Sequence, residues 1–470
     1  METPRTLRET PMRSNALTPP FLLVLALSTA AAAAAQPPVV LGAEVQVSAA
    51  PIGVAPSAAV EVGQPRVAVF SDGGFVVVWT VGEPGRTVQH VRIFAGPGGA
   101  GAVESERLLV PADGLQEANS VAALSDNSFV VAYTQVAASG LGVVMAARFK
   151  RDGALLVPPF QVHDPSSFSR FGGVVAAGPD PGPGPDPGPD SDNTAGGFAV
   201  AWSAAATESV APVGIVPYVN AFARRFTAAG PPLGPALLVA RGGFANYQVV
   251  SAYPTGLAEG GGGTLWVAVT VVAGTSSVEL ARLDPQGASL GILTPGPQGC
   301  CTTRAAATVK RAADGSVVFA WEADIDGAPG VTTIWAQSYS PKARPLTAAP
   351  FLVSGRGTAE TNPAVAAFPR GALVAGWTDN GGAGVMGRLF GPFATPLSRP
   401  FQIDANAIAP EPLNDLAANA AGTVVAVWET PTDPRRWVIA RSFTPIVPLA
   451  AAAAGEAAGG EAAPAAGAAN

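Results

Sequence analysis

The chain is poor in several residue types on which catalysis and metal binding commonly depend. Among its 470 residues there are two histidines, His90 and His163, and two adjacent cysteines, Cys300 and Cys301. Two histidines exclude a multi-histidine metal cage and leave few routes to a histidine-dependent catalytic triad. No nucleophile motif of the G-x-S-x-G type accompanies them. We therefore expect ordinary structural histidines, no catalytic residues and no cofactor.

Charged residues are also scarce, and basic runs are absent. Charged residues make up 13% of the chain, the net charge is −7, and only Lys150, Lys310 and Lys342 are lysines. No stretch is basic enough to follow a phosphate backbone, so nucleic acid is not an expected partner. Beyond the N-terminus no apolar run is long enough to cross a membrane. The expected partner is an unknown protein or carbohydrate ligand, bound by a monomer.

The N-terminus has the features of an export signal. Arg5, Arg8 and Arg13 precede a short apolar run at 21–27, and the alanines at 30–35 supply a cleavage region near Ala35. This order of basic, apolar and small residues is typical of a secretory signal peptide. Residues 1–35 are therefore interpreted as a signal peptide, and the mature protein as secreted, periplasmic or on the cell surface.

Glycine and proline, by contrast, are abundant, and an internal repeat spans most of the chain. The 55 glycines and 46 prolines make long helices improbable. In seven units a Gly or Asn turn precedes a buried position by six residues. We call these seven positions, all but one of them aromatic, the ruler positions. The pairs are Gly73 and Trp79, Asn127 and Tyr133, Gly196 and Trp202, Gly263 and Val269, Gly315 and Trp321, Gly371 and Trp377, and Gly422 and Trp428.

Each unit contains a first strand rich in small residues, a second apolar strand that ends at the ruler position, and two weaker strands. Four strands per unit at intervals of about 50–70 residues are typical of propeller blades. The seventh unit lacks a fourth strand, and residues 41–48 match that strand in character. The sequence thus predicts an all-β fold, a single β-propeller over residues 36–449, most simply with seven four-stranded blades closed by an N-terminal strand. Six or eight blades and tandem β-sandwiches are the alternatives.

The units resemble a bacterial tandem repeat of the pattern dG-x-fvvxW … A-x-RFd-x-G, found in secreted or surface β-propeller-like proteins. The resemblance covers residues 37–446 and rests on segments such as Gly73–Trp79 and Ala146–Phe149. It implies a repeat architecture and says little about activity. The segment at 71–74 also departs from the Asp box of sialidases, which gives glycosidase activity little support.

Two segments lie outside the repeat. Residues 178–193 form a Pro/Gly/Asp-rich insert, which we interpret as an exposed loop. Within it, Asp190 and Asp192 are weak candidates for calcium ligands, against the simpler interpretation of a solvated linker. Residues 450–470 are rich in Ala and Gly and are expected to be a disordered tail.

Three aspartates are weak candidates for a binding site. Asp324, Asp326 and Asp379 follow ruler positions in loops between second and third strands, where they could form an acidic face. The alternative is that these loops merely keep the protein soluble. Cys300 and Cys301 could form a local disulfide, pair between molecules or stay free, and a redox enzyme is a remote alternative.

The function that follows is an exported binding or scaffold propeller that does not catalyse. The alternative is a secreted hydrolase or lyase with its active site at the mouth of the propeller channel. That alternative requires charged side chains from several blades to converge. The first strands, such as Val67–Val69 and Leu416–Ala418, are small and apolar and speak against it.

Overall fold

Antiparallel strands account for nearly all regular structure in the computed structural model. It describes residues 39–50, 52, 63–84, 86–96, 106–109, 115–136, 139–165, 168–178, 197–245, 248–260, 263–273, 275–294, 307–325, 328–355, 359–382, 384–405, 412–430 and 436–445. Helical structure within these residues is confined to short 3₁₀ turns, among them η3 (Pro369–Gly371) and η4 (Pro392–Ala394). The prediction of an all-β fold is confirmed.

The strands recur in the same order along the chain. The first strands are β2 (Gly63–Val69), β6 (Leu115–Ala123), β10 (Arg170–Ala177), β15 (Gln248–Glu259), β19 (Ala307–Arg311), β23 (Glu360–Phe368) and β27 (Leu413–Ala418). The second strands are β3 (Phe75–Glu83), β7 (Phe129–Val136), β11 (Phe198–Val210), β16 (Leu265–Ala273), β20 (Val317–Ile325), β24 (Ala372–Asp379) and β28 (Val424–Glu429). The third strands are β4 (Arg86–Phe94), β8 (Gly142–Phe149), β12 (Gly214–Phe226), β17 (Thr275–Leu283), β21 (Ala328–Tyr339), β25 (Gly384–Phe390) and β29 (Val438–Pro445). The outer strands are β5 (Arg107–Leu108), β9 (Leu155–Gln161), β13 (Leu237–Ala240), β18 (Ser289–Leu293), β22 (Phe351–Leu352), β26 (Phe401–Gln402) and, for the last sheet, β1 (Val39–Gln46). The remaining short strand, β14 (Gly243–Ala245), pairs with β15.

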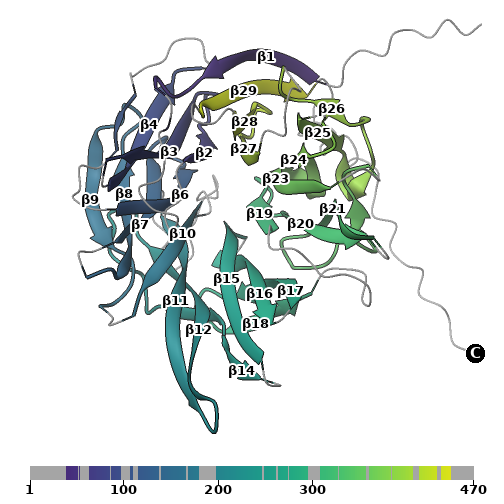
Figure 1. The fold of residues 1–470 in the computed structure, drawn as a ribbon. Helices are drawn as coiled ribbons and strands as arrows, with labels where there is room; N and C mark the ends of the chain where they lie inside the picture. Colours follow the sequence, from purple (N-terminus) through teal and green to yellow (C-terminus); the bar gives the residue numbers. More distant parts are fainter. Residues whose placement is uncertain are drawn as a thin grey trace, which may run out of the picture. The chain divides into compact units, whose positions relative to one another are not determined.

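The first strands lie innermost, around a common centre (Figure 1). In the described part of the chain each first strand contacts the first strand of the next unit, from β2 through to β27, and β27 contacts β2. The sheets radiate outward from these strands, and the first two are joined by one parallel pair between β4 and β6. The N-terminal ends of all first strands therefore meet at one end of a central channel.

The six-residue spacing reflects a hairpin between first and second strands. The turn residue has a positive φ in every described copy, for example 88° at Gly73 and 60° at Asn127, and only Gly196 lies outside the described residues. Gly and Asn tolerate this conformation best, which explains their presence there. The side chains at all seven ruler positions are buried, at 2% exposure or less. They form core between neighbouring sheets and not a surface for stacking sugars.

The two ends of the described chain meet in the last sheet. β1 pairs antiparallel with β29, from Val39 opposite Pro445 to Gln46 opposite Ile439. One buried cluster then joins the last sheet to the first, including Val47, Trp79 and Val427. A hydrogen bond of 2.7 Å from the Gln64 N–H to Glu429 Oε1 crosses the same junction. The last sheet is thus completed by residues from the opposite end of the chain.

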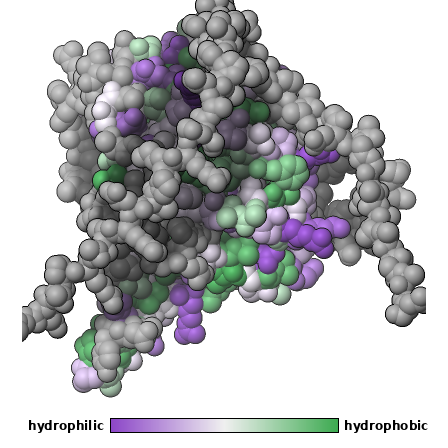
Figure 2. Space-filling model, turned by 90° about the vertical axis from the view of Figure 1, so that its right-hand side faces the viewer, coloured by the Kyte–Doolittle hydropathy of each residue, from purple (hydrophilic) through white to green (hydrophobic). Residues whose placement is uncertain are grey.

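The outer surface mixes apolar and polar groups. Figure 2 shows hydrophobic residues interleaved with hydrophilic ones on the coloured part of one side. Several exposed apolar side chains lie on outer strands, such as Leu155 on β9 and Ile292 on β18, both 49% exposed. Among the described residues no helix is both long and apolar enough to span a bilayer.

Candidate polar mouth of the central channel

One end of the channel opens into a cavity of about 410 Å³ lined by all seven first strands. Amide and hydroxyl side chains contribute much of its polar lining: Gln64, Asn362, Asn414, Ser120, Thr255 and Thr308. Its charged lining residues are Arg66, Lys310 and Asp415. We call this set of residues the channel mouth. Concave cavities in which a few polar groups from several elements converge are common positions for active sites.

Lys310 breaks the repeat at a channel position. In each sheet one first-strand residue pairs with the residue three before the ruler position. The residues at this position are Ala68, Ala122, Ala176, Ala258, Lys310, Ala366 and Ala417. The six alanines show that a methyl group at this position is sufficient for the first strands to pack. A lysine among them is not required for packing, and such local exceptions are expected at functional sites.

The layer nearer the mouth carries the other two charges. The corresponding first-strand residues pair with the residue just before the ruler position. They are Arg66, Ser120, Val174, Gly256, Thr308, Ala364 and Asp415. Five sheets therefore place a small or uncharged residue at this position, and the first and last sheets place Arg66 and Asp415. All three exceptions line the cavity at one end of the channel.

Lys310 and Asp415 form an ion pair between two sheets, and Arg66 bonds to the backbone beside Asp415. Lys310 Nζ lies 3.3 Å from Asp415 Oδ1, although the two residues are 105 positions apart. Asp415 also accepts hydrogen bonds from the N–H groups of Val67, at 3.2 Å, and Leu416, at 2.9 Å. Arg66 Nη1 donates to the carbonyl of Asn414. The backbone of β2 and β27 thus fixes the position of the carboxylate.

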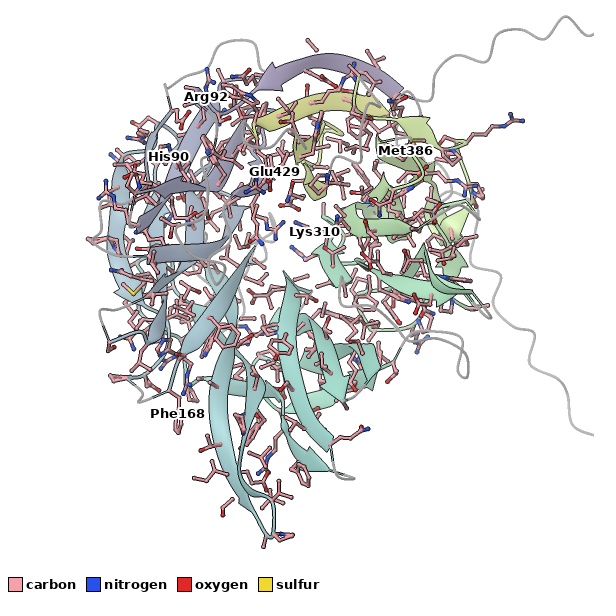
Figure 3. All side chains as sticks on the ribbon, in the orientation of Figure 1. His90, Arg92, Phe168, Lys310, Met386 and Glu429 are labelled. Carbon is pink, nitrogen blue, oxygen red and sulfur yellow. The ribbon has the colours of Figure 1, made fainter. Side chains whose placement is uncertain are left out.

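Glu429 does not line the channel mouth but accepts hydrogen bonds from two residues that do, Gln64 and Asn414. Its Oε1 accepts from the Gln64 N–H and from Asn414 Nδ2 at 3.2 Å, and its Oε2 lies 3.1 Å from Arg436 Nη1. Burial raises the pKa of the Glu429 carboxyl, against the effect of these hydrogen bonds and cations. In Figure 3, Lys310 and Glu429 lie beside the centre, whereas His90 and Phe168 lie toward the outside. Glu429 thus orients mouth residues and is itself only 4% exposed.

The aspartates expected on an acidic face lie elsewhere. Asp324 was expected in an exposed loop, but it is within β20, opposite Thr332, and only 8% exposed. The loop expectation is wrong because β20 and β21 continue beyond the ruler position. Asp379 ends β24, where its Oδ1 accepts from the Gly381 N–H at 2.8 Å. Neither residue lines the channel mouth.

Three further sequence predictions fall on residues outside those described. They concern Asp326, the calcium candidates Asp190 and Asp192, and the disulfide candidates Cys300 and Cys301. Within the described ranges, no group of three or more His, Cys, Asp or Glu side chains is arranged to hold a metal ion. These interpretations stay predictions.

Both histidines have structural partners away from the mouth. His90 Nδ1 lies 2.6 Å from Glu106 Oε1, beside Trp79. His163 Nε2 accepts the N–H of Val144 at 3.2 Å. Ser48, Ser354 and Asp404 accept a strand N–H in the same way after the outer strands of other sheets. His163 therefore occupies a position at which several sheets place a side chain that accepts an N–H of the third strand. Burial lowers the pKa of the His163 imidazole.

One buried carboxyl group has a strongly shifted pKa. Glu360 begins β23, is 3% exposed and accepts the Ser354 Oγ–H at 2.5 Å. Burial raises the pKa of Glu360 to about 7, the negative charge of Asp379 acts in the same direction, and the Ser354 hydrogen bond opposes them. Glu360 and Asp379 face each other in register. Since Glu360 does not line the channel mouth, we interpret it as a determinant of stability.

This shift predicts that the folded protein loses stability as pH rises through 7. Below the unfolded-state pKa near 4.5, Glu360 is protonated in both states, and its contribution is fully present. As pH rises, the unfolded state ionises first, so up to about 3 kcal/mol is lost progressively between about pH 4.5 and 7, and the loss is complete once the folded state has also ionised. Urea unfolding across this range is expected to show a smaller loss in Glu360→Gln, whose side chain does not ionise. Equal pH profiles in the two proteins would contradict this role.

The charged mouth was missed at the sequence level although a signal was present. The first-strand segments read Val67–Ala68, Val121–Ala122, Val175–Ala176, Leu257–Ala258, Val309–Lys310, Val365–Ala366 and Leu416–Ala417. Aligning all seven would have isolated Lys310 as the exception. Arg66 and Asp415 each lie one residue before these segments, so they fall just outside Val67–Val69 and Leu416–Ala418, from which an apolar channel was expected. The expectation of a channel with few polar groups was wrong for this reason.

Comparisons with known proteins identify the fold. No protein-family model and no curated protein matches the sequence. Among solved structures, an ulvan lyase has a TM-score of 0.50 at 10% identity, covering 84% of this chain and 95% of its own. An α-L-arabinofuranosidase of Fusarium graminearum has a TM-score of 0.42 at 11% identity, with coverages of 84% and 97%. A sialidase of Trypanosoma rangeli has a TM-score of 0.42 at 9% identity, covering 87% of this chain and 58% of its own.

These findings correct the functional expectation. The interpretation as a non-catalytic binding or scaffold propeller is contradicted, because the solved structure with a TM-score of 0.50 is that of a polysaccharide lyase. This finding favours the catalytic alternative over the non-catalytic interpretation. At about 10% identity the likeness itself is one of fold, so activity is argued below from this chain's own residues. The chain is an all-β protein with a β-propeller fold.

Proposed function

We propose that this chain is an enzyme that cleaves a polysaccharide, with its active site at the channel mouth. The observation that carries the proposal is the meeting of Arg66, Lys310 and Asp415, which come from three different sheets. A catalytic channel requires charged side chains from several blades to converge, and these three residues meet that requirement.

The chemistry of the mouth supports catalysis more than structural stability. A carboxylate and an ammonium group that lie 3.3 Å apart in a partly enclosed cavity provide proton transfer and charge stabilisation together. The six alanines at the position of Lys310 indicate that folding does not need the charge there. The ulvan lyase that shares the fold is a polysaccharide lyase, which supports a polysaccharide as the substrate.

The wider architecture belongs to the same proposal. The chain forms a seven-bladed propeller of the secreted bacterial repeat type, closed by β1, which pairs with β29. Residues 1–35 direct export, residues 450–470 form a tail, and the mature monomer is secreted, periplasmic or at the cell surface. The secretory pattern at the N-terminus supports this location.

A single substitution tests the site. Lys310→Ala introduces the residue that the six other sheets carry, so the variant is expected to fold with an almost unchanged melting temperature. Its cleavage of a responsive polysaccharide, measured as new chain ends, is expected to fall by roughly 100-fold or more, as is usual when a group that stabilises developing charge is removed. Lys342→Ala, which removes the same charge at an exposed turn, is the matched control and should keep full activity.

Two results would overturn the proposal. One is the absence of cleavage by the unmodified protein on a broad panel of acidic and neutral polysaccharides. The other is equal activity in Lys310→Ala and the unmodified protein, which would place the active site away from the mouth.

A further inference from the structure

The channel mouth carries a local excess of positive charge. Within the described residues its lining includes two cations, Arg66 and Lys310, and one carboxylate, Asp415. The chain as a whole has a net charge of −7. Cations gathered in a cleft concentrate the field there and attract anions locally, even in a protein that repels them overall. The charge of the mouth therefore fits an anionic ligand.

Both cations retain capacity to bind such a ligand. Among the described residues, Asp415 is the one acceptor within hydrogen-bond distance of Lys310 Nζ, and an ammonium group has three donors. Arg66 uses Nη1 for the carbonyl of Asn414 and has four further N–H donors. The side chain of Lys310 is 33% exposed, so its head group is accessible. Paired cationic donors of this kind match a carboxylate.

The carboxyl groups of the mouth do not suit hydrolysis. Glycoside hydrolysis usually needs two carboxyl groups on either side of the scissile bond. Asp415 is the one carboxylate in the described lining, and the acidic groups behind it are engaged. Glu429 is held by Gln64, Asn414 and Arg436, and Glu322 Oε1 accepts the Asn362 N–H at 2.7 Å. Both glutamates are at most 5% exposed.

We infer that the substrate is a uronate polysaccharide and that the mouth cleaves it by β-elimination; this inference rests on the proposed function. Arg66 and Lys310 bind the uronate carboxylate at C5 and stabilise the charge that develops on it. Asp415 takes the proton from C5, the C–H electron pair forms a C4–C5 double bond, and the C4–O bond breaks. The departing oxygen receives the proton from Asp415, which restores the carboxylate. Atoms and electrons balance without an external reactant.

Each residue has a distinct role in this reaction. Asp415 is the base, and the hydrogen bonds from Val67 and Leu416 hold it in place. An aspartate is an adequate base for a proton next to a carbonyl when the developing negative charge is stabilised. Arg66 contributes to binding and charge stabilisation, and Ser120 at the same position of the second sheet provides a structurally compatible replacement. Asn362 and Asn414 add amide groups to the lining.

The test compares uronate polymers with their carboxyl-reduced forms. Polygalacturonate, alginate and glucuronan are incubated with the purified full chain, together with the same polymers after reduction of their carboxylates to alcohols. Neutral arabinan and galactan complete the panel. Ultraviolet absorbance of unsaturated uronyl ends reports elimination, and a reducing-end assay reports every cleavage. We expect unsaturated ends from at least one uronate polymer and none from its reduced form.

Variants separate binding from proton transfer. Asp415→Asn is expected to lower kcat by roughly 100-fold or more, with a smaller change in KM. Arg66→Ser is expected to raise KM by roughly 10-fold or more, because it removes a charge-assisted contact to the substrate. Lys342→Ala should leave both constants unchanged. Thermal unfolding of each variant establishes that the fold is retained.

The possible failures are distinguishable. Reducing ends without unsaturated ends, or cleavage confined to neutral or carboxyl-reduced polymers, would overturn elimination on uronates and leave the proposed function intact. No cleavage of any polymer would overturn the proposed function and the inference with it. Elimination that persists in Asp415→Asn at an unchanged kcat would overturn the role of Asp415 as the base.

Discussion

Removing β1 by deleting residues 39–48 is expected to lower the free energy of unfolding by at least ~5 kcal/mol. The deletion removes the outer strand of the last sheet and its pairing with β29. It also removes the buried side chains of Val39 and Val47, each worth about 1.5–3 kcal/mol when fully buried. The hydrogen bonds from Val438 to Ser48 and from Arg441 to Gly42 are lost as well, at about 1 kcal/mol each. The deletion then leaves the edge of β29 unpaired.

Urea or thermal unfolding of the truncated protein measures this effect. Deletion of residues 450–470 is the matched control at the other end of the chain, and we expect it to leave the midpoint nearly unchanged. An unchanged melting temperature after removal of residues 39–48 would show that the N-terminal strand does not complete the last sheet.

Trp377→Ala is expected to destabilise the protein by about 3–5 kcal/mol, the usual effect of truncating a large buried aromatic side chain. Trp377 is 2% exposed and lies in a buried cluster with Val318 and Ile334 of the preceding sheet and Phe390 of its own sheet. The substitution leaves a cavity between two sheets. Because neighbouring sheets are held together largely by these clusters, we expect the unfolding midpoint to fall without a change in secondary structure.

Trp437 is the control for this substitution. It precedes β29, is only partly buried and lies outside the ruler positions. Trp437→Ala should therefore cost clearly less in the same denaturation measurement. Equal losses at Trp377 and Trp437 would mean that the ruler position has no special place in the core.

The sequence alone determined the local features of this protein. Gly73 and Asn127 mark hairpin turns because their backbones adopt a positive φ, and the apolar residues up to Trp79 and Tyr133 form buried second strands. Such signals depend on residues within one unit, so periodicity and spacing reveal them. The same reasoning identified residues 41–48 as matching the fourth strand that the seventh unit lacks. It also assigned the ruler aromatics to the core.

The tertiary structure decided which side chains meet in the channel. Lys310 and Asp415 are 105 positions apart and come within 3.3 Å only because first strands from separate sheets surround one axis. Asp324 shows the converse, since the length of β20 and β21 placed it inside a sheet and not on an acidic face. The residues shared by all repeats are those that each sheet needs in order to fold. Residues that differ from the repeat indicate a site only when the structure shows that they lie close together. The proposed active site therefore consists of three residues that the repeat does not require, and the arrangement of the first strands around one axis brings them together.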